Sequence, residues 1–186
     1  MTQFRIVGFS GNLTRPSKTK SFVDHIATEA GAQFGASPSV YDIADLGPSF
    51  PAARWSKELD DQASGIIAEL KQADLLVVGT PTFKGSYTGL FKHFFDLLDP
   101  SDLRGKPVIL VATGGGDRHS LIVEHQLRPL FGFFEAFSLP TAIYASDRDF
   151  TDGAISNPAI RNRATQAVSE AVLATYGRNF LQVAAE

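Results

Sequence analysis

Short apolar runs of strand character alternate along this chain with segments of helical character, and this alternation restricts the fold more than any other feature. In the helical segments, apolar residues recur four positions apart, as at Phe22, Ile26 and Ala30. The runs expected to form strands are residues 4–9, 39–43, 74–80, 107–113 and 140–145. The segments expected to form helices are residues 17–34, 58–72, 88–99, 119–137 and 157–176. The sequence therefore predicts a β-α unit repeated five times.

The third and fourth apolar runs, DLLVVGT at 74–80 and PVILVAT at 107–113, are apolar on both faces of an extended chain. Strands of this kind need helices on both sides, which is typical of a parallel sheet. Right-handed crossovers leave few topologies, and for five strands the order 2-1-3-4-5 is common. We therefore predict an α/β fold with a doubly wound, five-stranded parallel sheet. Its ligands are expected at the carboxyl ends of strands one, three and four.

The composition fits one globular domain. Of 186 residues, 44% are hydrophobic and 20% are charged. We take residues 1–186 as a single domain and expect residues 177–186 to form a flexible C-terminal tail. A net charge of −3 gives no electrostatic reason to expect nucleic acid or an anionic membrane as a partner. No apolar run approaches the roughly 20 residues of a membrane span, and the start MTQFRIVGF lacks signal-peptide features, so we expect a cytoplasmic protein.

The residue types exclude several kinds of catalytic site. The chain has no cysteine, which rules out disulfides, thiolate nucleophiles and thiolate metal sites. Its four histidines are scattered and show no metal-binding spacing, so no metal site is expected. There is also no sign of a Ser-His-Asp or paired-carboxylate arrangement. Chemistry carried by a bound cofactor fits such a chain best.

The first loop at the expected ligand edge reads SGNLTRPSKTKSF, residues 10–22. The start of a helix offers unpaired N–H groups and a partial positive charge, which suit a phosphate. The P-loop and the G-x-G-x-x-G fingerprint are both absent. The alternative is an ordinary helix cap, in which Ser17 or Thr19 satisfies its own helix. The candidate phosphate donors are Ser10, Arg15, Ser17, Lys18 and Thr19.

The second loop follows the third strand and begins Thr80, Pro81, Thr82, Phe83, Lys84. Proline after the strand gives a rigid, extended exit. Small residues next to aromatic ones allow the backbone to approach a flat ring. The alternative is that Phe83 and Tyr87 only cover the edge of the sheet.

The third loop follows the fourth strand, and its candidate site residues are Thr113, Gly114, Gly115, Gly116 and Asp117. Three consecutive glycines are entropically costly, so we expect a backbone that passes close to a ligand and donates N–H groups. A tight turn, the alternative, needs only one or two glycines. A phosphate site beside two loops that face a flat ligand favours flavin mononucleotide, FMN.

Three segments carry a family resemblance that covers nearly the whole chain: GTPTFKGSYTGLFKHFFDLLDP at 79–100, GKPVILVATGGG at 105–116 and VEHQLRPLF at 123–131. The chain resembles the NAD(P)H-dependent FMN reductases of the flavodoxin-like superfamily. Within them it is most similar to reductases that supply reduced flavin to alkanesulfonate or methanesulfonate monooxygenases. The resemblance implies a flavodoxin-like fold, FMN with NADH or NADPH as cofactors, and an FMNH2-dependent monooxygenase as partner.

The chain departs from the family pattern at two places. The family's phosphate loop reads G-S-x-R-x-x-S, whereas Phe9 stands here in place of its Gly and Asn12 near its Arg. We expect Arg15 to supply that charge. Phe83 replaces the usual Tyr, which keeps packing on the flavin but removes a hydroxyl.

Members of the sulfonate group carry an inserted Tyr that forms a π-bulge at the subunit interface, and His125 falls at that place. Pro129, four residues on, removes a backbone donor and clashes with the carbonyl of His125, which gives the bulge a local cause. The alternative is a surface or core histidine beside a proline kink. The seven phenylalanines of the two neighbouring helices favour a homodimer or homotetramer, or else a Phe-rich core. They are Phe91, Phe94, Phe95, Phe131, Phe133, Phe134 and Phe137.

The predicted reaction is hydride transfer from the nicotinamide C4 to the flavin N5, with orientation supplied by the protein. Backbone N–H groups of Gly114–Gly116 are expected near the ring, where they stabilise negative charge. Reduced FMN then passes to the monooxygenase. Two alternatives stay open: a quinone, azo-dye or chromate reductase with tightly bound FMN, and a non-enzymatic flavodoxin-like electron carrier.

Overall fold

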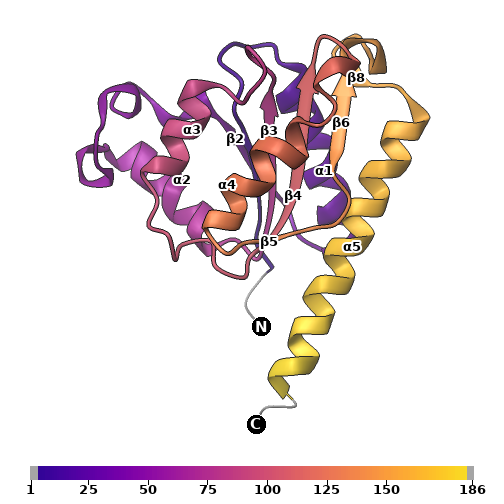
Figure 1. Ribbon diagram of the computed structural model, residues 1–186. Helices are drawn as coiled ribbons and strands as arrows, with labels where there is room; N and C mark the ends of the chain where they lie inside the picture. Colours follow the sequence, from indigo (N-terminus) through magenta and orange to yellow (C-terminus); the bar gives the residue numbers. More distant parts are fainter. Residues whose placement is uncertain (1–3, 184–186) are drawn as a thin grey trace.

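A parallel sheet with helices on both faces forms the centre of the computed structural model (Figure 1). The structure describes the backbone of residues 4–183 and the side chains of residues 4–176. The strand order is β2-β1-β3-β4-β5, with β6 also paired to β4, and all these pairs are parallel. This confirms the predicted order. The strands are β1 (Ile6–Ser10), β2 (Ser39–Asp42), β3 (Leu75–Pro81), β4 (Pro107–Gly114), β5 (Phe137–Ser138) and β6 (Ile143–Ser146).

Helices α1 and α5 cover one face of the sheet, and α2, α3 and α4 cover the other (Figure 1). Side chains of β3 alternate between the two cores, since Leu75 and Val77 join the α1/α5 side while Leu76 and Val78 join the opposite side. The strand is therefore apolar on both faces, as a doubly wound sheet requires. The helices are α1 (Lys18–Phe34), α2 (Asp61–Gln72), α3 (Gly89–Asp96), α4 (Arg128–Phe133) and α5 (Pro158–Val183).

Short elements complete the described chain. A hairpin of β7 (Phe150–Thr151) and β8 (Ala154–Ile155) follows β6 and was not predicted. The 3₁₀ turns are η1 (Ile43–Leu46), η2 (Phe50–Ala52), η3 (Ser56–Glu58), η4 (Asp117–His119) and η6 (Asp147–Asp149). No helix among the described residues is both long and apolar enough to cross a membrane.

The predicted fifth strand, residues 140–145, is wrong in its bounds. Two short strands, β5 and β6, pair with β4 in its place, and the segment between them leaves the ladder. Pro140 has no N–H to donate. The amide of Thr141 donates instead to the Glu170 carboxylate of α5, at 2.9 Å. Neither Pro140 nor the amide of Thr141 therefore donates a hydrogen bond to the sheet, and the strand is interrupted at these residues.

Helix α5 extends further than expected. It runs from Pro158 to Val183, so residues 177–183 of the expected tail are helical. Residues 184–186 of that tail lie outside the described residues.

A π-helical turn, η5, spans Val123–Leu127 and precedes α4. His125 lies at its centre, where the sequence predicts the bulge. The amide of Arg128 donates to the carbonyl of Val123, five residues back, as a π turn requires. Pro129 follows at once and has no amide to continue an α-helical ladder onto His125.

The phenylalanine cluster is mostly core. Phe91, Phe94, Phe95, Phe131 and Phe134 are buried within the single chain. Only two of the seven stay exposed: Phe133 at 68% and Phe137 at 48%. The Phe-rich core that the sequence left open as an alternative therefore accounts for five of the seven rings.

Candidate functional site

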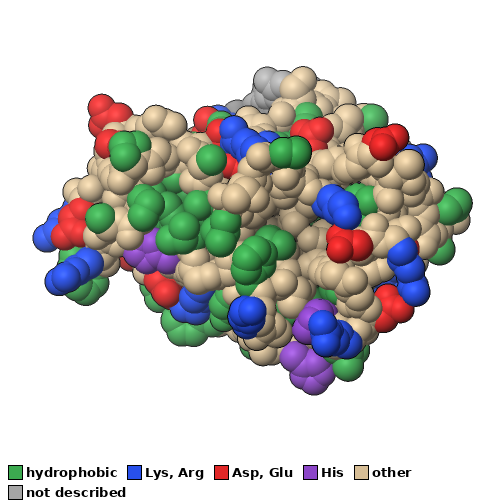
Figure 2. Space-filling model, turned by 90° about the horizontal axis from the view of Figure 1, so that it is seen from above, with side chains coloured by type: hydrophobic (Ala, Val, Ile, Leu, Met, Phe, Trp, Pro, Cys, Tyr) green, Lys and Arg blue, Asp and Glu red, His purple; other side chains and the backbone are tan. Residues whose placement is uncertain are grey.

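A cavity of about 390 Å³ opens at the carboxyl edge of the sheet, the edge viewed in Figure 2. Three loops predicted to face a ligand meet around it, together with one residue that follows β6. Its lining is made of Asn12, Leu13, Thr14, Pro16, Ser17, Lys18, Thr19, Pro81, Thr82, Phe83, Thr113, Gly114, Gly115 and Asp147. The volume falls in the range typical of small-molecule sites.

The N-terminus of α1 forms one wall of this cavity. Ser17 is the N-cap, and its Oγ accepts from the amide of Lys20 at 3.2 Å. The N-cap alternative is therefore realised, but Ser17 lines the cavity as well. Thr19 Oγ1 lies 2.7 Å from Thr113 Oγ1 in a buried hydrogen bond that ties the first loop to the third. Amides of the first helical turn have no partner within the helix, so this wall suits an anion.

Arg15 does not line the cavity, in contrast to the role expected for it. Its Nε and Nη2 donate to the two oxygens of Asp42 at 2.7 and 2.6 Å, and Nη2 also lies 2.6 Å from Asp45 Oδ2. Asp42 is fully buried. Burial alone would raise the pKa of Asp42, but hydrogen bonds from Arg15 and Asn12 outweigh it and hold that pKa below its usual value. The guanidinium of Arg15 is thus bound by carboxylates of β2 and η1 rather than directed at a ligand.

Two buried polar atoms of the first loop, Ser10 Oγ and Asn12 Oδ1, have no hydrogen-bond partner among the described residues. Ser10 ends β1 and does not line the cavity, whereas Asn12 does. The amide nitrogen of Asn12 is already used, at 3.1 Å from both Thr14 O and Asp42 Oδ2. An unpaired buried acceptor costs free energy unless a ligand or water donates to it. Asn12 Oδ1 fits a hydroxyl donor such as those of a ribityl chain.

The second loop folds back on itself as a tight turn. Phe83 and Ser86 exchange backbone hydrogen bonds of 2.8 and 3.1 Å, and Lys84 and Gly85 take positive φ values of 53° and 87° between them. Phe83 lines the cavity and is 51% exposed. Lys84 and the buried Thr80 do not line it. Of this loop, the structure brings Pro81, Thr82 and Phe83 to the site.

The third loop has one glycine that packing requires and two that packing does not. A Cβ on Gly114 would overlap the hydroxyl of Tyr144 and lie 3.2 Å from Thr82 Oγ1. A Cβ on Gly115 would meet only Asp147, in an ordinary contact at 3.8 Å, and one on Gly116 would meet nothing within 4 Å. Protein packing does not explain these two glycines. A ligand that approaches the backbone would explain Gly115, which lines the cavity, whereas the predicted site residue Gly116 does not line it.

Sequence reasoning did not single out Asn12, Leu13, Thr14 and Pro16 of the first loop, which line the cavity, and it also missed two residues at the end of β6. Asp147 lines the cavity after β6, and Tyr144 of β6 donates to the Gly116 carbonyl at 2.6 Å. The signal available was their place at the end of the fifth predicted strand. Asp117, which was predicted, does not line the cavity and instead pairs with Arg148 at 2.6 Å.

The N-terminus of α1 suits a phosphate, Asn12 Oδ1 is an unpaired acceptor, and the exposed Phe83 lines the same cavity as the open backbone of Gly115. These features fit FMN. The comparisons with known proteins agree. The sequence profile described as NADPH-dependent FMN reductase matches residues 4–151. The chain belongs to this family.

Relatives and solved structures are similar to this FMN reductase over most of its length. NADH-dependent FMN reductase SfnE of Pseudomonas putida is 37% identical over 171 residues, 92% of each chain. An FMN reductase (NADPH) of Pseudomonas aeruginosa is 37% identical over 178 residues, 96% of each chain. A solved oxidoreductase from Corynebacterium diphtheriae superposes with a TM-score of 0.82 at 32% identity, covering 95% of this chain and 99% of the other. The chain is a flavin reductase that uses FMN with NADH or NADPH.

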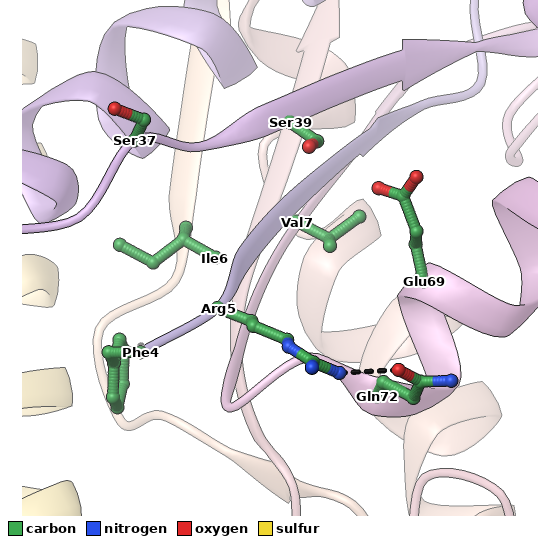
Figure 3. Close-up of a pocket in the computed structure, with 8 residues that line it drawn as sticks. All are labelled: Phe4, Arg5, Ile6, Val7, Ser37, Ser39, Glu69 and Gln72. Atoms are coloured by element: carbon green, nitrogen blue, oxygen red, sulfur yellow. Dashed lines mark hydrogen bonds between the residues drawn. The ribbon is translucent and has the colours of Figure 1, made fainter. Parts of the chain in front are cut away.

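A second cavity, of about 270 Å³, lies at the opposite edge of the sheet (Figure 3). It is lined by residues at the start of β1, the turn before β2 and the end of α2, and Arg5 donates there to Gln72. Glu69, another lining residue, accepts from Tyr41 at 2.8 Å. None of the three predicted loops contributes to this cavity. Because ligands of such sheets bind at the carboxyl ends of the strands, the first cavity is the candidate site.

Proposed function

We propose that FMN binds in the cavity at the carboxyl edge, with its phosphate at the N-terminus of α1 and its ring beside Phe83 and Gly115. One observation carries this proposal: the three loops singled out for phosphate and ring contacts line a single cavity of about 390 Å³. FMN bound there would supply the redox chemistry, as acceptor at N5 of a hydride from the nicotinamide C4 of NADH or NADPH.

The chain's own residues bind and orient. Ser17, Lys18 and Thr19 face the phosphate with first-turn amides, hydroxyls and one ammonium. Asn12 Oδ1 accepts from a hydroxyl of the ribityl chain, which satisfies a buried acceptor. The backbone of Gly115 faces the ring, and its N–H stabilises negative charge there. No side-chain acid or base is needed for this reaction.

Hydrogen bonds to the third loop hold the second loop in its conformation. The amide and the hydroxyl of Thr82 both donate to the carbonyl of Thr113, at 2.7 and 2.9 Å. Phe83 is thereby held at the mouth of the cavity, where its exposed ring packs on the flavin and excludes water from one side.

We further propose that reduced FMN leaves and is consumed by a flavin-dependent monooxygenase of the alkanesulfonate or methanesulfonate type. The motifs at 79–100 and 123–131 support this, as does the similarity to the NADH-dependent FMN reductase SfnE. A reductase that draws on NADH or NADPH works where these nucleotides are formed, and we place it in the cytoplasm. The alternatives, a reductase with tightly held FMN and a non-enzymatic carrier, are not favoured, because the relatives named above are FMN reductases.

We propose a homodimer or homotetramer whose interface includes the π turn. A groove of about 560 Å³ lies between α3 and the η5–α4 segment, and its lining includes Tyr87, His125, Pro129 and Phe133. Ser86 of the second loop donates to Gln126 of the π turn at 3.0 Å, assigning the amide oxygen as acceptor. The groove therefore adjoins the flavin loop, so that assembly and flavin binding are linked.

The test is oxidation of NADH and of NADPH followed at increasing FMN. Saturable stimulation by added FMN is expected, because FMN enters as a substrate. Absence of stimulation would contradict the proposal. A purified protein that stays yellow through dialysis and shows ping-pong kinetics without added FMN would favour the prosthetic-group alternative.

A further inference from the structure

The basic side chains around the first loop are neutralised by carboxylates of the same chain. Arg15 binds Asp42 and Asp45, with shortest contacts of 2.6 Å to each. Lys20 lies 3.9 Å from Asp42 and 3.7 Å from Asp45. The two cations and two carboxylates on this side of the loop sum to zero charge.

The third cation, Lys18, is the one that lines the cavity, and it too is paired. Its Nζ lies 2.7 Å from Asp147 Oδ1 and 5.7 Å from the centroid of the Phe150 ring. Asp147 lines the same cavity from the segment that follows β6. The two side chains are 43% and 62% exposed, so solvent weakens this pair and either partner can exchange it for another.

The cradle for the phosphate therefore contains a competitor of like charge. A phosphate monoester carries about −1.5 to −2 charges at pH 7. To pair with Lys18 it must displace Asp147 or share the ammonium with it, and a carboxylate near a phosphate is repelled. In Figure 2, basic and acidic side chains are interspersed over this edge and form no single basic patch.

We propose that Asp147 competes with the flavin phosphate for Lys18 and so lowers the affinity for FMN relative to riboflavin, which keeps FMN exchangeable. This inference rests on the proposed function, because it requires the FMN phosphate at the N-terminus of α1. It assigns a specificity-determining role to a residue outside the three loops of the site. The helix amides hold the phosphate, and Asp147 limits how tightly.

The test compares the dissociation constants of FMN and riboflavin, measured by quenching of flavin fluorescence. Riboflavin has the same ring and ribityl chain but no phosphate, so the ratio Kd(riboflavin)/Kd(FMN) isolates the phosphate contact. Asp147→Asn is expected to raise this ratio about two- to fivefold, the range for one partly exposed ion pair. Lys18→Gln is expected to lower the ratio. In the Lys18→Gln background, Asp147→Asn loses most of its effect.

The matched control is Asp152→Asn. It removes one carboxylate from the β7–β8 turn, which does not line the cavity, and the φ of 51° there is one that Asn tolerates well. The control is expected to leave the ratio unchanged. The gain in Asp147→Asn is also expected to shrink at 1 M salt, because the competing charges are exposed.

The outcomes separate this inference from the proposed function. If the wild-type protein binds FMN no better than riboflavin and the ratio stays at one in Asp147→Asn, there is no phosphate cradle, and both proposals then fail. A wild-type protein that prefers FMN, together with an Asp147→Asn variant of unchanged ratio, overturns the competition alone. An equal gain for both flavins in Asp147→Asn overturns it as well, because the change would then concern the ring.

Discussion

The hydroxyl of Tyr144 donates to the carbonyl oxygen of Gly116 at 2.6 Å, and this bond joins β6 to the glycine loop after β4. Burial first, and then the negative charge of Asp117, raise the pKa of Tyr144, so the phenol stays protonated and remains a donor. The loop therefore takes its shape from a neighbouring strand as well as from its own turn. Its position beside the cavity depends on this support.

Gly114→Ala is expected to lower the stability of the protein. The added methyl overlaps the Tyr144 hydroxyl and presses on Thr82, neither of which is free to move without breaking a hydrogen bond. Forcing a methyl into a packed region typically costs about 1–3 kcal/mol. Urea unfolding followed by circular dichroism measures the loss. The double variant Gly114→Ala, Tyr144→Phe should recover part of it, and no recovery would show that the clash lies elsewhere.

Gly115→Ala is expected to lower flavin affinity without lowering the stability of the protein. Its methyl meets only Asp147, at an ordinary contact distance of 3.8 Å, so stability should change by less than about 0.5 kcal/mol. If the flavin ring lies against this backbone, the affinities for FMN and riboflavin fall together. Gly116→Ala is the control, because Gly116 does not line the cavity. Unchanged flavin affinity in Gly115→Ala would place the ring away from this loop.

Low pH is expected to weaken the hydrogen-bonded ion pair between Arg15 of the first loop and Asp42 of β2. The pKa of Asp42 is lowered in the folded chain, so its contribution is present above the unfolded pKa of about 3.9 and is lost as the pH falls through the folded value. Asp42→Asn removes hydrogen bonds to a charged partner and should cost about 1.5–3 kcal/mol at pH 7. Below about pH 4 the difference from wild type should shrink.

Urea unfolding of wild type and Asp42→Asn at several pH values checks this expectation. Asp24→Asn, at an exposed position of α1, serves as the control for loss of one charge. A difference between wild type and Asp42→Asn that stays constant from pH 7 to pH 3 would mean that ionisation of Asp42 does not support the fold.

The sheet and its ligand edge were predictable because their causes are local. Strands such as β3 are apolar on both faces over consecutive residues, and Ser17 caps α1 within three residues of its own position. The π turn was expected from the family resemblance, and Pro129, four residues from His125, gives it a local cause as well. Each of these features follows from neighbours in the sequence.

The features that the sequence did not predict depend on partners far away in the chain. Arg15 is bound by Asp42, 27 residues on, and no local pattern shows that a carboxylate will reach it before a phosphate does. The break in the fifth strand depends on Glu170, 29 residues beyond Thr141. Asp147 reaches the cavity only because β6 ends beside β4.

Phe83→Ala is expected to weaken flavin binding without weakening the fold. Phe83 is 51% exposed in the single chain, so the loss of stability should be small. An aromatic stacking contact is worth about 0.5–1.5 kcal/mol, which corresponds to a fall of about two- to tenfold in affinity. FMN and riboflavin should be affected equally, since the ring is common to both. Trp55→Ala, at an exposed aromatic side chain that does not line the cavity, is the control.

Phe133→Lys is expected to dissociate the oligomer. Phe133 is 68% exposed in the single chain and lines the groove between α3 and the η5–α4 segment, so a charge there is tolerated by the monomer but not by an apolar interface. Light scattering coupled to size-exclusion chromatography should show a wild-type dimer or tetramer and a variant of lower mass with a similar melting temperature. Leu173→Lys, exposed on α5 at the opposite face of the sheet, is the control. A wild-type mass that survives Phe133→Lys but not Leu173→Lys would place the interface on α5.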